Sequence, residues 1–268
     1  HGAERFLMID RRALMAGLAV APALAAMPAA ARQAGQLTAA EIVGRAHAAA
    51  GGADWMRPRS LTLAGRGMFW PQGTQAGVIE VPDYRMWRVY PTESTDAHAA
   101  NGWVRIDARL TDGSLLFQAA YDGETSYNQQ GPVPGAQASR EWSENFGFGI
   151  IRFALDPGFS LDRLPDDAAG DRPMHVVRVN DPEGGKTLFG IDAVTFAILW
   201  LGFETPRGWH ERRYSEFYRN PGVSFTQPGR VRLYYDGVKQ NEILWTHYAL
   251  NEDLPRDLFQ IPGAVPRG

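Results

Sequence analysis

Strict alternation of apolar and charged residues is the feature of this chain that most restricts its fold. In the range 103–110 the apolar positions recur at every second residue, and they are Val104, Ile106, Ala108 and Leu110. A period of two residues is typical of a β-strand with one buried face. The turn-forming pairs Asp112-Gly113 and Asp122-Gly123 follow directly. Such turns predict that consecutive strands are antiparallel neighbours.

Similar patterns recur from residue 60 to residue 248 and predict roughly ten strands. We expect two separate strands at 76–81 and 84–90, because Pro82 removes a hydrogen bond from the ladder between them. The Pro- and Gly-rich range 129–135 is expected to be a loop. Parallel β-α-β units are not expected, since the long helices that they require are missing from the pattern. The predicted fold class is therefore mainly β with a few helices.

Two segments carry helical signals. Thr38 and Glu41 form a capping box in front of a helix at 39–50, which a glycine pair ends. The second segment, Ser139–Leu155, is rich in large apolar residues and is interrupted by two glycines. We interpret it either as a lid over a sheet or as an ordinary core helix.

The N-terminal segment has the three parts of an export signal, starting at Met8. The charged run Asp10-Arg11-Arg12 precedes an uncharged apolar range, 13–26, and small residues at 29–31 offer a cleavage site. The apolar range is shorter than the roughly 20 residues of a membrane span. We expect export by the twin-arginine route and removal of residues 1–31. The alternatives are an ordinary Sec signal and an uncleaved anchor. Residues 32–268 are then one periplasmic domain without a stable transmembrane span.

Composition excludes several classes of function. The chain has no cysteine, which excludes disulfides, thiolate metal sites and an N-terminal lipid anchor. Its net charge of −3 and pI near 6.1 do not fit a nucleic-acid-binding face, which is usually strongly basic. We expect no cofactor, no metal and no nucleic-acid partner.

Motifs for catalysis are weak. His210-Glu211 lies in a strand pattern, so its two side chains point to opposite faces, and Tyr214 breaks the His-Glu-x-x-His zinc pattern. No Gly-x-Ser-x-Gly elbow accompanies the serines. Gly65-Arg66-Gly67 lacks the following helix of a phosphate-binding loop. We predict no catalytic residues.

Four segments spread over most of the chain share a known pattern. They are Glu41-Ile42-Val43 with Ala46-His47, the strand 61–69, YSEFYRNPGVSFTQPGRVRLYYDG at 214–237, and DLPRDLFQIP at 253–262. Together they resemble the periplasmic lipoprotein-carrier (LolA/LolB-like) superfamily. The resemblance implies a half-open antiparallel β-barrel of about ten to eleven strands, with N-terminal and mid-chain helices covering one face. It also implies that acyl chains or other apolar ligands are held between sheet and helices. Without a cysteine to acylate, the chain is more similar to the soluble carrier than to the anchored receptor.

We therefore expect an exported binding or carrier protein for an apolar ligand, such as a lipid or a lipoprotein acyl chain. The expected cavity-lining aromatic residues, each alternatively an ordinary core residue, are Trp87, Trp103, Trp142, Phe146, Phe148, Trp200 and Trp209. Arg85, Arg88 and Arg105 either present cations to a carboxylate or head group or face solvent. The alternatives are a cofactor-free enzyme on the same scaffold and an envelope interaction module, and another envelope protein is a possible partner.

Overall fold

The fold is mostly β-sheet in a computed structural model that describes residues 36–71, 77–90, 102–133 and 149–263. The helices are α2 (Ala39–Ala50), α3 (Ala53–Met56), α5 (Gly149–Phe153) and the 3₁₀ helix η2 (Arg256–Phe259). The strands are β1 (Ser60–Phe69), β2 (Ile79–Val89), β3 (Trp103–Arg109), β4 (Leu115–Tyr121), β5 (Ser126–Asn128), β6 (Gly131–Val133), β7 (Ser160–Ala169), β8 (Arg172–Asn180), β9 (Lys186–Asp192), β10 (Ile198–Thr205), β11 (Gly208–Tyr218), β12 (Gln227–Tyr235) and β13 (Val238–Leu250).

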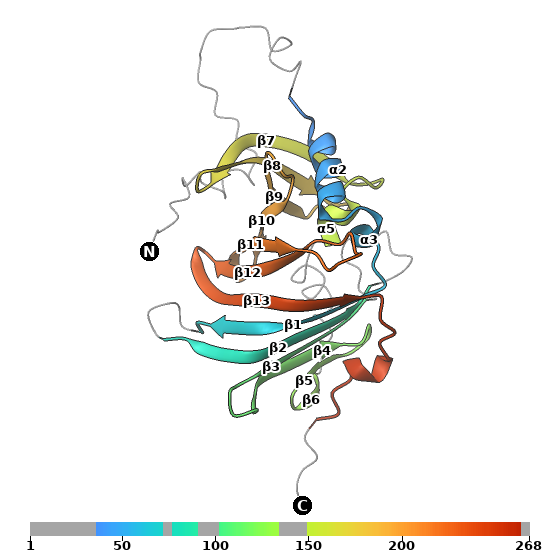
Figure 1. The fold of residues 1–268 in the computed structure, drawn as a ribbon, viewed down its shortest axis with the longest axis vertical. Helices are drawn as coiled ribbons and strands as arrows, with labels where there is room; N and C mark the ends of the chain where they lie inside the picture. The colour runs from blue at the N-terminus through green and yellow to red at the C-terminus, as the bar shows by residue number, and fades with distance from the viewer. Residues whose placement is uncertain (1–35, 72–76, 91–101, 134–148, 264–268) are drawn as a thin grey trace, which may run out of the picture.

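All thirteen of these strands belong to one antiparallel sheet, in the order β6-β5-β4-β3-β2-β1-β13-β12-β11-β10-β9-β8-β7. The two ends of the order do not pair with each other, so the sheet is an open half-barrel (Figure 1). The predicted fold class is confirmed. The number of strands is higher than predicted, because β6 forms inside the expected loop at 129–135 and β7 has a largely polar sequence without clear alternation.

The pairing of β1 with both of its neighbouring strands is irregular near the middle of β1. The register of β1 shifts against β13 at Gly65 and against β2 between Gly65 and Gly67. A Cβ atom at Gly65 would overlap the carbonyl oxygen of Leu244, so only glycine allows this approach. Pro82 lies opposite the second shift, where a proline costs no ladder hydrogen bond. The prediction of two strands separated at Pro82 was therefore wrong, and β2 runs through it.

Helix α2 begins and ends as the sequence predicts. The Thr38 side chain accepts a hydrogen bond from the Glu41 amide, and the Glu41 carboxylate accepts one from the Thr38 amide at 2.7 Å. The helix stops at Gly51, whose φ of 135° is one that side chains rarely allow. Its buried face, with Ile42 and Val43, packs into the main core.

The three α-helices lie together at one side of the curved sheet (Figure 1). Imidazole Nε2 of His47 in α2 is 2.7 Å from the Ile151 carbonyl oxygen of α5, which links the two helices. Of the predicted second helix, Ser139–Leu155, the range 149–153 is helical, and 139–148 lies outside the described residues. None of the helices in the described ranges has the length and hydropathy of a membrane-spanning segment.

Candidate functional site

Strand alternation gives the sheet two faces of different character. The inner face, defined here as the face that packs against α2, α3 and α5, includes Leu63, Met86 and Ile106 in the same core cluster as Ile42 of α2. The outer face is the opposite one. A ligand enclosed between sheet and helices contacts the inner face, so the face that each residue occupies decides its possible role.

Arg85, Trp87 and Arg105 lie on the outer face. Arg85 and Trp87 flank the inner-face residue Met86 along β2, and Arg105 precedes the inner-face residue Ile106 along β3. The register pairs Trp87 directly with Arg105. The Arg105 guanidinium lies 5.7 Å from the centre of the Trp87 ring. These three side chains are brought together, but away from the face that the helices cover.

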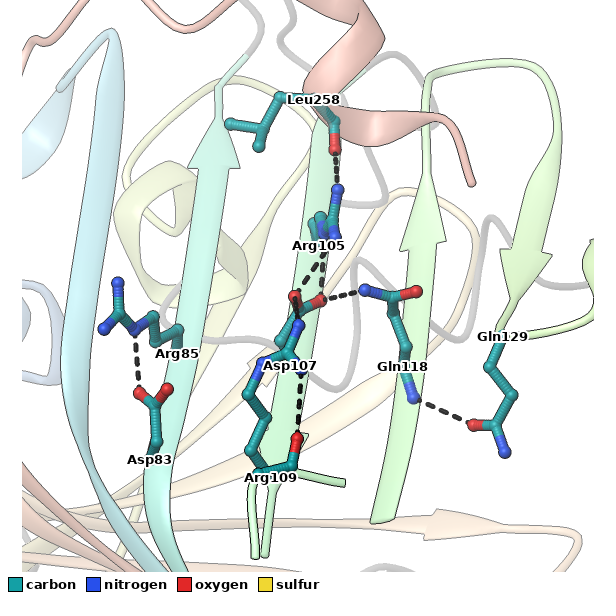
Figure 2. Close-up of polar contacts among 9 residues, drawn as sticks. Asp83, Arg85, Arg105, Asp107, Arg109, Gln118, Gln129 and Leu258 are labelled. Carbon is teal, nitrogen blue, oxygen red and sulfur yellow. Dashed lines mark hydrogen bonds and ion pairs between the residues drawn. The ribbon is translucent and has the colours of Figure 1, made fainter. Parts of the chain in front are cut away.

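The two outer-face arginines are engaged in ion pairs within the fold. Arg105 Nε donates to Asp107 at 2.9 Å, and a terminal nitrogen of Arg105 donates to the Leu258 carbonyl at 2.8 Å (Figure 2). Arg85 Nε donates to Asp83 at 2.7 Å. The carboxylate of Asp107 is almost fully buried and holds the Arg105 side chain in place. Because Arg105 also donates to Leu258 of η2, it attaches η2 to the sheet.

The other described tryptophans among the predicted lining residues, Trp103, Trp200 and Trp209, also pack on or near the outer face. Trp103 contacts the buried ring of Phe259 in η2, with ring centres 5.5 Å apart. Trp200 and Trp209 form a second, smaller core with residues such as Met174. There Trp200 covers Gly190 and Trp209 covers Gly202, where any larger side chain would collide with the indole. Aromatic rings over glycines stabilise strand pairing, which is a structural role.

Three predicted lining residues, Trp142, Phe146 and Phe148, lie outside the described residues. Their contact with a ligand stays a prediction.

The inner face carries an arginine site that we define as Arg88, Arg152 and Arg212 with Tyr90. Arg152 of α5 is only 5% exposed, and its guanidinium carbon lies 4.6 Å from the Trp55 ring centre and 4.9 Å from the Tyr90 ring centre. Arg88 lies over the same Tyr90 ring at 4.8 Å. The site is therefore assembled from α5, the end of β2 and β11, with aromatic rings between the cations.

Arg212 extends the site across the half-barrel. It lies on the inner face of β11 next to His210, whose Nε2 accepts a hydrogen bond from Arg212 Nε at 3.1 Å. Burial, followed by the charges of Arg212 and Arg207, lowers the pKa of His210 to about 2. The buried imidazole is thus neutral, and its ring stacks on Phe203 with centres 4.6 Å apart.

The charges of Arg152 and Arg212 act on Arg88. Burial lowers the pKa of Arg88, and the charges of Arg152 and Arg212 lower it further. Burial alone would raise the pKa of Tyr90, but Arg152 and Arg88 outweigh it and hold that pKa below the usual value. A phenol that ionises more easily despite burial indicates a local field that favours negative charge.

One pocket lined wholly by described residues lies between the end of α2, α3 and strands β10–β12. Its volume is about 30 Å³, room for roughly one or two water molecules. Its mostly apolar lining residues are Ala49, Ala50, Trp55, Ala197, Ile198, Phe217, Thr226 and Pro228. Trp55 belongs both to this pocket and to the ring stack of Arg152, so the apolar pocket and the cationic site are adjacent.

Sequence reasoning identified Arg88 as one of three alternating arginines but missed Arg152, Arg212 and Tyr90. The signal for Arg88 and Tyr90 is the period of two that they share with Met86, an inner-face residue. Within the described residues, no cluster of three or more histidine or acidic side chains is arranged to hold a metal ion.

Comparison with known proteins bears on the fold. No family model matches the chain, and no curated protein matches it. A solved DUF1329 family protein from Desulfovibrio piger is similar with a TM-score of 0.50 at 8% identity, covering 84% of this chain and 98% of that one. A LolA superfamily protein from Nitrosomonas europaea is similar with a TM-score of 0.47 at 13% identity, with the same two coverages. At these identities the likeness concerns the fold alone, and the half-open antiparallel barrel that the sequence resemblance implied is confirmed by the sheet order.

Proposed function

We propose that the protein is exported to the periplasm and binds an apolar ligand between the inner face of its sheet and helices α2, α3 and α5. The observation that supports this most directly is the apolar pocket at Trp55, which the small side chains of Ala49 and Ala50 line on the side of α2. Each methylene that leaves water for such surroundings contributes about 0.8 kcal/mol. A lipid tail needs apolar walls of this kind and few directional contacts.

The size of this pocket sets a condition on binding. A space of about 30 Å³ is far smaller than a lipid tail, so a bound tail has to widen it. Hydrogen bonds hold the end of α2 to the segment that leads into β12, from the Thr226 amide to the Ala50 carbonyl at 2.7 Å and from Arg219 to the Ala49 carbonyl at 2.8 Å. We therefore propose that the pocket widens by rearrangement of its large side chains, Trp55 and Phe217, and not by displacement of α2.

Lipid extraction tests this proposal directly. The full chain is produced with export in a Gram-negative host, purified without detergent, and examined by native mass spectrometry and by extraction into organic solvent. We expect a stoichiometric adduct that extraction identifies as a lipid. Folded, monodisperse protein that carries no adduct and takes up none from lipid vesicles would contradict the proposal.

Export is tested separately, through the paired arginines. In Arg11→Lys/Arg12→Lys we expect the precursor to stay in the cytoplasm, whereas the unaltered chain yields a periplasmic product whose mass begins near Arg32. Equal export of both chains would argue for the Sec route. A product that retains residues 1–31 would argue for an anchor.

The enzyme and the envelope interaction module stay alternative predictions. General acid–base catalysis works best with a group whose pKa is near neutral pH, and His210 is held neutral instead. The geometry of the inner face therefore supports binding better than general acid–base catalysis by this histidine.

A further inference from the structure

Arg152 is a buried cation without a neutralising carboxylate among the described residues. It forms no ion pair with any carboxylate of the described residues, and its Nε has no hydrogen-bond partner. Its guanidinium lies over the rings of Trp55 and Tyr90 and also forms a hydrogen bond with the Tyr90 side chain. Burying a charge without a counter-ion costs several kcal/mol, so such a residue is retained where the charge serves another purpose.

Arg88 brings a second cation to the same place. Its guanidinium shares the Tyr90 ring with Arg152, the two lying 4.8 Å and 4.9 Å from the ring centre. Like charges repel when held close together in a buried site, and a bound anion that contacts them offsets that repulsion. The planar donor fork of arginine matches the oxygens of a carboxylate or phosphate.

The location of this pair relative to the pocket is equally informative. Trp55 presents its ring to Arg152 and also lines the apolar pocket. The Trp55 ring is therefore shared by the apolar pocket and by Arg152. An apolar space and a cation that adjoin one aromatic ring have the polarity of an amphiphile.

We infer that the arginine site binds the acidic head group, carboxylate or phosphate, of an amphiphile whose tail occupies the apolar space between α2, α3 and the sheet. This inference rests on the proposed function and specifies its ligand class. Arg152 and Arg88 make the charge-assisted contacts to the head group, and Trp55 packs against the first part of the tail.

The test compares three ligands of equal chain length below their critical micelle concentrations. Binding of dodecanoate, dodecyl phosphate and dodecanol to the full chain is measured by isothermal titration calorimetry. Because charge-assisted hydrogen bonds are stronger than neutral ones, we expect at least one anion to bind roughly tenfold or more tightly than the alcohol. A preference for only one of the two anions identifies the head group.

Two matched variants separate the arginine site from general charge. Arg152→Met is expected to lose the preference for the anion while still binding dodecanol, and Arg85→Met, the same change on the outer face, is expected to keep it. Arg88→Met is measured in parallel and replaces Arg152→Met if circular dichroism shows that the latter is unfolded.

The outcomes are distinguishable. Equal binding of all three ligands, or a preference that survives both inner-face variants, would overturn this inference and leave the apolar carrier intact. Failure of all three ligands to bind would overturn the proposed function, and the inference with it.

Discussion

The two faces of the sheet both combine arginines with aromatic rings, but they treat the charges differently. On the outer face, buried carboxylates pair with arginines, as in Arg105–Asp107 at 2.9 Å and Arg213–Glu211 at 2.6 Å. On the inner face, Arg152 lies against the rings of Trp55 and Tyr90 without such a partner in the described residues. The carboxylates of the outer face neutralise their arginines within the fold. Arg152 contacts aromatic rings instead, and we propose that its charge serves a ligand.

The largest expected effect tests whether the outer-face aromatic cluster is structural. Trp200 is almost fully buried over Gly190, and its indole nitrogen donates to the sulfur of Met174. Trp200→Ala should lower the free energy of unfolding by about 3–5 kcal/mol, because it leaves a large cavity. Urea unfolding measures this loss. Ligand affinity per folded molecule should not change, and a selective loss of binding would place Trp200 in the site after all.

The second effect concerns the outer-face ion pairs. Asp107 is buried and accepts hydrogen bonds from Arg105 and from the Gln118 side chain, at 2.9 Å each. Asp107→Asn keeps the shape but removes the charge, and we expect a loss of about 2–4 kcal/mol in unfolding free energy. The control is Asp83→Asn, whose exposed pair with Arg85 should contribute less than about 1 kcal/mol. Equal losses in the two variants would contradict the structural role of the buried pair.

The third effect is a pH dependence that originates on the inner face. Burial and the charges of Arg212 and Arg207 lower the pKa of His210 from its ordinary 6.5 to about 2 in the folded protein. Below pH 6.5 the unfolded chain binds a proton that the folded chain does not, so stability falls as the pH falls, down to the folded pKa. The slope that His210 contributes is about 1.4 kcal/mol per pH unit.

The measurement compares wild type with His210→Gln by urea unfolding between pH 7.5 and pH 4.5. The difference between the two unfolding free energies should be constant above pH 6.5 and should shrink steadily below it. A difference that does not vary with pH would mean that His210 is protonated in the folded protein or accessible to water.

Much of the architecture could be predicted because it depends on local patterns. The capping box at Thr38 fixes the start of α2, and alternation in 103–110 separates the two faces of β3 correctly. The assignment of aromatic residues to a ligand cavity could not be made this way. Trp200 and Trp209 are as apolar as inner-face residues, and the outer cluster that buries them depends on glycines in neighbouring strands.

The arginine site could not be predicted from the sequence. Arg152 lies in a five-residue helix, and its contacts with Trp55 and Tyr90 join segments that are far apart in the chain. Arg85 and Arg88 have similar neighbours in sequence, and only the strand phase separates them, Arg88 sharing the inner face with Met86. The bulge at Pro82 interrupts the alternation of inward and outward side chains. The face of Arg85 and Arg88 could therefore not be inferred from the residues of β2 that precede Pro82.

The smallest expected effect isolates this difference of phase. Arg85 forms an exposed ion pair with Asp83 on the outer face, and pairs of this kind contribute roughly 0–1 kcal/mol. In Arg85→Gln we therefore expect unfolding free energy and dodecanoate affinity close to those of wild type, whereas Arg88→Gln, three residues away, should weaken dodecanoate binding about tenfold. Calorimetry on the two variants at one pH and ionic strength checks this. If Arg85→Gln weakens binding as much as Arg88→Gln, long-range charge explains anion binding and the inner face has no special role.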